Sequence, residues 1–391
     1  MSPGNSHRHH YVPKWYQKRF IKENQTSYFR LDLSPEIIKT PEGKIIRKGE
    51  ILNKGVDKFF YEIDLNTTKY FDIENDDIEK YLFGTIDKNG ALAIDSVASI
   101  SSHYWMKGVH DNITNFFEYM DAQKLRTPKG LAWIKEALNA VDHNDVLIKM
   151  QTIRQMHCTM WAEAFMEIVS AEKSSVKFIV SDNPVTVYNS CCYPKSKYCN
   201  FPFDPGIELK GTRTIFPLDL NHCVILTNIE YVRRPFEAIM PRTNARTFDT
   251  TIINLMDIVR DRYLKEKEVL GINYILKSRA HKYIAAAEKE WLYPERYMKK
   301  KNWKKFDEIF HPVTKPFGVL GRGGQIYMGG KDNRLIHTQD EFGRKPKSKK
   351  EWNEMEQQSR KLHEHFMSLI KKEQENTNGS EFPIIKSNSN L

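Results

Sequence analysis

The sequence HHYVPKWYQKRF, residues 9–20, places two histidines, a proline and four aromatic side chains within twelve positions. A proline pushes the residue before it out of the α region, so we expect an extended chain up to Pro13 and a short helix after it. Within that helix Tyr16 and Phe20 are four residues apart and share a face. We predict an N-terminal arm, residues 7–20, that packs on the body of the protein and largely buries its aromatic side chains: Tyr11, Trp15, Tyr16 and Phe20.

The composition restricts the class of protein. The chain has 391 residues, of which 40% are hydrophobic and 28% charged, which suffices for a packed core. No window approaches the roughly 18 uninterrupted apolar residues that cross a bilayer, and the N-terminus lacks the apolar core of a secretory signal. Five cysteines, an odd number, do not make a disulfide framework. These observations predict a cytoplasmic protein without a membrane partner.

Hydrophobic periodicity changes along the chain and predicts the fold class. Alternation typical of strands occurs in residues 27–36, 176–190 and 212–228. A 3–4 spacing of apolar residues instead predicts a long helix from Asn144 to about Glu172, with His157 on its apolar stripe. We therefore predict an α+β fold in which helices pack around a small, mostly antiparallel sheet. The domains expected are a main domain, a basic helix-rich region and a disordered tail, over residues 1–280, 281–376 and 377–391.

The positive charge is concentrated in the last part of the chain. Of the formal charge of +10, most lies in residues 281–391, where 22 Lys and Arg face 15 Asp and Glu. The clusters KKKNWKK (299–305) and RKPKSKK (344–350) are suited to neutralising phosphates, which predicts a nucleic-acid or anionic partner. Lysine-rich surfaces also serve solubility alone, so both interpretations stay open.

Two polar groups in the main domain suggest a site. Gln123 and Arg126 are three apart on one helix face, just before the helix-ending Thr127-Pro128. An arginine there can clamp a phosphate or carboxylate, with the glutamine as an orienting donor. The alternative is an interior ion pair that holds the fold together, with Asp182 as the partner. Asp182 stands in an Asp-Asn-Pro turn, which suits either a carboxylate at a sheet rim or ordinary turn chemistry.

Several of these segments, in order, resemble a bacterial family of unknown function. The arm resembles its His-His-Tyr-Val-Pro signature with a spaced Tyr and Phe. The other matching segments are AQKLRTP (122–128), FIVSDNPV (178–185), IFPLDLNH (215–222) and Asn254. The resemblance spans about residues 9–265, and it implies where a site would lie without implying a reaction.

The resemblance also bears on the adjacent histidines. In an extended segment His9 and His10 point to opposite sides, so one of them can enter a pocket. His10 is then a general base or metal ligand, or else a hydrogen-bonded part of the arm. The residues predicted for the site are three catalytic and three binding side chains: His10, Arg126 and Asp182, with Gln123, Asn183 and His157.

Cofactor signals are weak in this sequence. CCYPKSKYC (191–199) does not match the Cys-x-x-Cys spacing of a zinc site, so no metal-ligating residue is predicted. A divalent metal held near the site carboxylate is left open as a cofactor. The main hypothesis is a hydrolase acting on nucleic acid or nucleotide, with base, anion clamp and water or metal orienter. This hypothesis includes a role in stress or phage defence, which no particular residue of the sequence supports.

Two alternatives without chemistry remain. One is a binding or sensor module that holds an anionic ligand. The other is a structural subunit that docks through the charged helix expected at residues 350–376.

Overall fold

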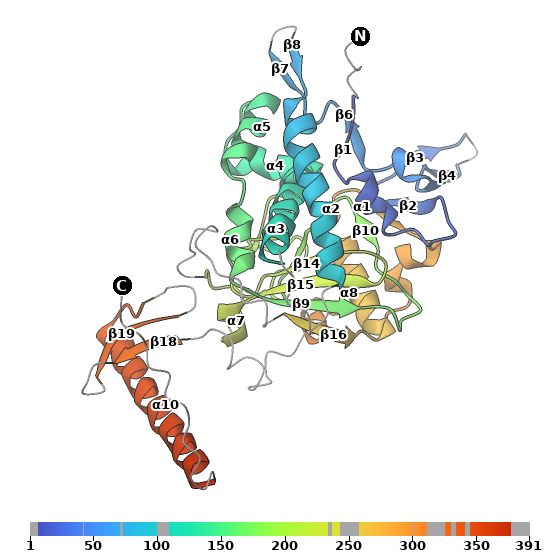
Figure 1. Cartoon of the computed structure of the whole chain (residues 1–391). Helices are drawn as coiled ribbons and strands as arrows, with labels where there is room; N and C mark the ends of the chain where they lie inside the picture. Colours follow the sequence, from blue (N-terminus) through green and yellow to red (C-terminus); the bar gives the residue numbers. More distant parts are fainter. Residues whose placement is uncertain are drawn as a thin grey trace. The chain divides into compact units, whose positions relative to one another are not determined.

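The computed structural model describes residues 7–41, 43–70, 73–99, 109–233, 237–242, 258–299, 301–310, 325–329, 334–340 and 345–376. The chain divides into two compact units, residues 1–320 and residues 321–391. The predicted α+β class is confirmed (Figure 1). The division falls later than the boundary expected at residue 280, because residues 283–286 form an inner strand of a sheet in the first unit. The tail predicted at 377–391 lies outside the described residues.

The first unit alternates short strands with helices. Its helices are α1 (Lys14–Lys18), α2 (Gly84–Ser99), α3 (Val109–Leu125), α4 (Pro128–Ala137), α5 (His143–Thr152), α6 (Met156–Ala162), α7 (Ile229–Arg233) and α8 (Glu266–Arg279). Short 3₁₀ segments lie at Val56–Lys58, Lys289–Leu292, Pro294–Arg296 and Trp303–Ile309, and a π-helical turn at Ile78–Phe83 leads into α2. Its strands are β1 (Arg8–His10), β2 (Tyr28–Asp32), β3 (Glu36–Lys39), β4 (Ile45–Lys48), β5 (Ile51–Lys54), β6 (Tyr61–Ile63), β7 (Thr68–Tyr70), β8 (Ile73–Asn75), β9 (Ala164–Ser170), β10 (Val180–Ser181), β11 (Thr186–Tyr188), β12 (Cys199–Asn200), β13 (Asp204–Pro205), β14 (Arg213–Pro217), β15 (His222–Asn228), β16 (Val259–Tyr263) and β17 (Tyr283–Ala286).

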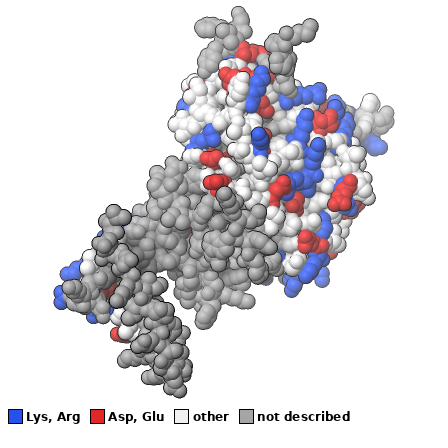
Figure 2. Space-filling view, viewed as in Figure 1, with Lys and Arg blue, Asp and Glu red and all other residues white. Residues whose placement is uncertain are grey.

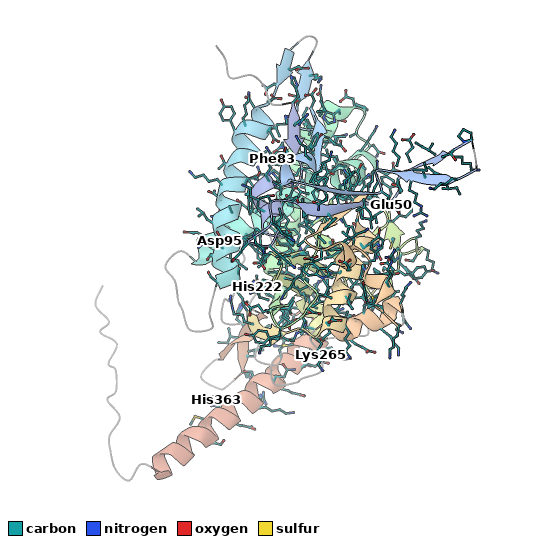
Figure 3. The ribbon with its side chains drawn as sticks, turned by 90° about the vertical axis from the view of Figure 1, so that its right-hand side faces the viewer. Glu50, Phe83, Asp95, His222, Lys265 and His363 are labelled. Atoms are coloured by element: carbon teal, nitrogen blue, oxygen red, sulfur yellow. The ribbon has the colours of Figure 1, made fainter. Side chains whose placement is uncertain are left out.

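Two sheets organise this unit. The larger has the strand order β11-β14-β15-β9-β16, antiparallel except that β16 runs parallel to β9. The smaller has the order β10-β17-β2-β5 and is antiparallel throughout. Helices α2 and α3 run side by side next to the larger sheet, while the β3–β4 hairpin projects from the body (Figures 1 and 3). One hydrophobic core spans the helices and both sheets.

The long helix predicted over residues 144–172 is wrong. Helix α5 ends at Thr152, and Gln155 takes a left-handed conformation (φ 67°) before α6 begins. Residues 164–170 then form β9, an inner strand that pairs with β15 on one side and β16 on the other. Its side chains are buried on both faces, so its apolar run carries no two-residue alternation and imitates a helical stripe.

The N-terminal arm packs into the core as expected. Tyr11, Tyr16 and Phe20 are buried, whereas Trp15 is half-buried. The ring of Tyr16 stacks on Phe216 of β14, with centroids 5.4 Å apart and planes 2° from parallel. Aromatic pairs of this kind add to the free energy of burial, so the arm holds helix and sheet layers together.

The second unit contains a hairpin and a helix. Strands β18 (Gln325–Gly329) and β19 (Leu335–Asp340) pair antiparallel, and α10 spans Lys349–Asn376. Charged residues occur along most of α10, which fits the charged helix expected at residues 350–376. Among the described residues, no helix combines the length and apolar character needed to cross a bilayer.

Candidate functional site

A sharp corner between α3 and α4 creates the wall of a cavity. Thr127 caps α4 by accepting a hydrogen bond from the amide of Gly130 (3.1 Å), and Pro128 occupies the first helical position. A Cβ on Gly130 would lie 2.2 Å from the Lys124 carbonyl oxygen, so only glycine lets the two helices approach this closely. The Thr-Pro helix end read from the sequence therefore fixes the corner.

A cavity of about 460 Å³ lies between this corner, α6 and the segment 201–208. Most of its wall is apolar, formed by Leu125, Trp133, Met156, Met160, Val187, Phe201, Pro202, Pro205 and Ile207. A few polar side chains converge on it: Lys124, Lys129, His157, Asn183, Asp204 and Glu208. An apolar hollow of this size with a few polar groups is typical of a small-molecule site.

His157 and Asp121 form a buried pair at the cavity wall. The Nδ1 atom of His157 lies 2.7 Å from Oδ1 of Asp121, which projects from α3, and both side chains are almost fully buried. The Asp121 carboxylate also accepts the amide of Gln155 (2.8 Å), so it fixes the start of α6 as well. A carboxylate on Nδ1 holds the proton there and leaves Nε2 as the basic nitrogen. Nε2 has no hydrogen-bond partner among the described residues, and His157 is one of the residues that line the cavity.

Two lysines flank the Thr-Pro corner. Lys129 Nζ lies 2.7 Å from Asp204 Oδ1 and donates to the carbonyl of Arg279 (2.7 Å). Burial alone would raise the pKa of Asp204, but Lys129, Lys124 and Arg279 outweigh burial and lower it. Lys124 has only a 3.4 Å contact with the carbonyl of Val185, and burial lowers the pKa of its ammonium.

Gln123 and Arg126 lie together, but they hold the arm instead of lining the cavity. Gln123 Nε2 donates to the carbonyl of Tyr11 (2.7 Å), and its Oε1 accepts from Arg126 Nη2 (2.7 Å). The carboxylate partner of Arg126 is Asp87 of α2, at 2.7 Å, and not Asp182 as the ion-pair interpretation expected. The guanidinium therefore has its anion within the fold, and the arm, α2 and α3 meet at this cluster.

Asp182 and Asn183 occupy the turn after β10, and their side chains have different roles. Asp182 accepts the backbone amides of residues 281, 282 and 283 at 2.6–2.8 Å, and so it ties this turn to β17. Burial raises the pKa of Asp182, and the three amides oppose that rise. Asn183 instead lines the cavity and donates from Nδ2 to the carbonyl of Arg279 (3.2 Å).

His10 lies at the end of β1, where its ring is 5.5 Å from Tyr61 of the paired strand β6. Among the described residues it makes no hydrogen bond or ion pair with Arg126 or Asp182, and none of the three residues lines the cavity described above. Burial, with Lys14 nearby, lowers the pKa of His10 to about 4. Its neighbour His9 points inward and accepts the amide of Asn66 (3.0 Å). The two histidines do face opposite ways, and it is His9 that the arm uses structurally.

Because the folded-state pKa of His10 is depressed, its stability contribution is present above pH 6.5 and is lost as pH falls towards 4. The shift corresponds to about 3 kcal/mol, which we reduce to roughly 1–2 kcal/mol because the ring is half-exposed. His10→Gln is therefore expected to flatten the fall in unfolding free energy between pH 6.5 and 4, measured by urea denaturation. His143→Gln, at an exposed position, should leave the fall unchanged, and a parallel fall in both variants would contradict the assignment.

The sequence missed the residues that complete the cavity. Asp121, Lys124 and Lys129 lie within or next to the Gln-x-x-Arg-Thr-Pro segment, but the contact partners His157, Val185 and Asp204 are 36, 61 and 75 positions further along the chain. The resemblance at Asn254 lies outside the described residues. Within the part of the chain that the structure describes, no group of three His, Cys, Asp or Glu side chains is placed to hold a metal ion.

The first basic cluster, residues 299–305, belongs to the first unit. On the face in Figure 2, Lys and Arg are interspersed with Asp and Glu. In the first cluster the described lysines are exposed, while Trp303 donates from Nε1 to the carbonyl of Asn189 (2.9 Å) and anchors the segment to the first unit. The segment has a packing role whether or not its lysines contact phosphates.

Comparison with known proteins gives a family but no activity. No curated protein and no solved structure matches the chain. The model of DUF4238, described as a protein of unknown function, matches residues 8–290, which extends the resemblance read over 9–265 at both ends. The match includes the arm, the α3–α4 corner and the turn at Asp182. The chain therefore belongs to the DUF4238 family of proteins of unknown function.

Proposed function

We propose that this protein is a hydrolase that acts on a small ester or phosphoester within the cavity bordered by α4 and α6. The observation that carries the proposal is the His157–Asp121 pair, with Nδ1 held by a carboxylate and Nε2 unpartnered at the wall of an apolar cavity. A histidine oriented in this way is a ready general base.

In the proposed reaction, Nε2 of His157 takes a proton from a water molecule, and the resulting oxygen nucleophile attacks the carbonyl carbon or phosphorus. Asp121 keeps the ring in the reactive tautomer and stabilises the imidazolium that forms. The proton on Nε2 then passes to the departing oxygen, which restores the neutral histidine. No side chain of the arm takes part in these steps.

The cavity favours a small substrate over a polynucleotide. Its volume of about 460 Å³ suits a ligand of nucleotide size, and Trp133 and Phe201 offer flat apolar contacts. This narrows the hydrolase hypothesis read from the sequence. Nucleic-acid contact through residues 299–305 and 344–350 stays a separate proposal.

A binding module without chemistry is the second candidate function. The predominance of apolar side chains on the wall, with no serine or threonine among those that line it, favours this alternative. Such a protein would bind a ligand and return it unchanged.

Purified protein can be assayed with p-nitrophenyl acetate, p-nitrophenyl phosphate, bis-p-nitrophenyl phosphate and nucleoside triphosphates. We expect turnover of at least one substrate, and a fall of about 10²–10⁴-fold in His157→Gln because general-base catalysis contributes that much. Asp121→Asn should lose a large part of the same factor, since its amide no longer fixes the tautomer.

His222→Gln is the matched control, because His222 also pairs with an aspartate, Asp219 (3.1 Å), on β15 away from the cavity wall. It should retain full activity. Turnover that survives in His157→Gln would refute the proposed base. Binding of intact substrate without product, in protein with native His157, would favour the binding module.

A further inference from the structure

Most buried cations in the first unit have an anionic partner within the fold. Buried lysines and arginines pair with carboxylates as Arg126–Asp87, Lys129–Asp204, Lys210–Glu237 and Arg213–Asp307. Arg279 has instead the carbonyls of Cys192 and Phe203 and the sulfur of Cys199 as acceptors. Fully partnered burial is the rule for charged groups, because an unpaired charge in a low dielectric is costly.

Lys124 is partly exposed at the cavity wall, and it has no such carboxylate partner among the described residues. Its Nζ has one contact with a described residue, the carbonyl of Val185 at 3.4 Å, and no carboxylate within ion-pair distance. Asp204, a carboxylate that acts electrostatically on Lys124, pairs with Lys129 at 2.7 Å. Lys124 lines the cavity from the last turn of α3, so its ammonium has N–H donors left for an acceptor group inside the cavity.

We propose that Lys124 is the anion subsite of the cavity, and that the ligand is a small amphipathic molecule carrying one phosphate or carboxylate. The inference deepens the proposed function, since the subsite belongs to the same cavity as His157. The anion would complete the ion pair that the fold leaves open at Lys124.

The position of the subsite suits the proposed base. Asp121 and Lys124 are three residues apart on α3, hence on one face and about 5 Å apart along the helix axis. His157 pairs with Asp121. An anion bound at Lys124 would therefore bring the ester bond next to it towards Nε2 of His157, within about one turn of α3.

The apolar wall defines the rest of the ligand. Trp133, Met156, Met160 and Phe201 line the cavity, and methionines adapt to ligand shape while the aromatic rings offer flat faces. An aryl or alkyl body packed there would contribute affinity through burial, and the anion would fix its orientation. Inorganic phosphate alone lacks this body and should bind weakly.

Proton uptake is an independent signature of the subsite. Burial lowers the pKa of Lys124 when the cavity is empty, and a bound anion would raise it again. Ligand binding should therefore be accompanied by uptake of a proton at alkaline pH. A lysine that merely supports the fold gives no such coupling.

Isothermal titration calorimetry on the full chain can test the proposal, using His157→Gln as background so that no turnover interferes. The probes are 1-naphthyl phosphate, 1-naphthoate, 1-naphthol and inorganic phosphate. We expect at least one of the two naphthyl anions to bind more tightly than 1-naphthol.

Lys124→Met should weaken anion binding about 10- to 100-fold, as the loss of one charge-assisted hydrogen bond implies. The affinity for 1-naphthol should stay unchanged. Titrations in two buffers of different ionisation enthalpy report the proton uptake.

Lys135→Met is the control, because Lys135 is an exposed residue in the last turn of α4 and is absent from this cavity. Lys124→Gln replaces Lys124→Met should the latter not fold. Equal affinity for 1-naphthol and both anions, or unchanged anion binding in the Lys124 variant, would overturn the subsite. Anion binding without hydrolysis by the native chain would remove the proposed hydrolase alone, and hydrolysis of neutral esters without anion preference would remove the subsite alone.

Discussion

Tyr16→Ala is expected to lower the free energy of unfolding by about 3–5 kcal/mol, the range for truncating a large aromatic side chain in a packed core. Tyr16 is fully buried, stacks on Phe216 and donates its hydroxyl to the carbonyl of Pro217 in β14. Its removal leaves a cavity where the arm meets the larger sheet, and it leaves that carbonyl without its donor. Urea denaturation followed by circular dichroism measures the change.

Tyr16→Phe separates the ring from the hydroxyl. It keeps the stacking and should cost only about 1–2 kcal/mol, the usual penalty for one buried acceptor left unpaired. If Tyr16→Ala unfolds at the same urea concentration as the native chain, the arm is not part of the core.

Asp182→Asn is expected to lower the free energy of unfolding by about 2–4 kcal/mol. The carboxylate accepts three backbone amides of the segment 281–283, and an asparagine side chain has one acceptor oxygen and an N–H group that faces those amides. At least one amide is then buried without an acceptor, and the link between β10 and β17 weakens. Thermal and urea denaturation of the purified variant measure the loss.

Asp95→Asn provides the comparison, because Asp95 is an exposed residue of α2 that pairs with Arg19 at 2.5 Å (labelled in Figure 3). A surface ion pair of this kind contributes about 0–1 kcal/mol. Should Asp182→Asn keep native stability while abolishing activity, Asp182 would be a catalytic group, as the sequence alone suggested.

The fold class and the arm followed from the sequence because they depend on local patterns. Pro13 fixes where helix α1 begins, and the ring of Tyr16 in that helix packs on Phe20 just after it, with centroids 5.2 Å apart. The strand β9 escaped prediction for a tertiary reason, since a strand buried on both faces loses the alternation that distinguishes it from a helix.

Some of the residues selected from the sequence lie at the cavity. His157 and Asn183 line the cavity, whereas Arg126 was correctly placed near the interior but assigned the wrong partner. Asp87 lies 39 positions before Arg126, on a helix whose packing against α3 has no sequence signature. The same holds for Lys124. No local sequence pattern shows that Asp204 pairs with Lys129, so that Lys124 is left without a carboxylate partner among the described residues.

The central claim is that Asp121 fixes the tautomer of His157 through Nδ1 and leaves Nε2 available to a ligand in the cavity. Nitrogen-15 NMR of histidine-labelled protein at neutral pH measures the tautomer directly, with His157→Gln identifying the resonance. We predict a proton on Nδ1 and none on Nε2, and a shift of the Nε2 resonance when 1-naphthyl phosphate or 1-naphthoate is added. A proton on Nε2, or an Nε2 resonance indifferent to every ligand that binds, would contradict the account.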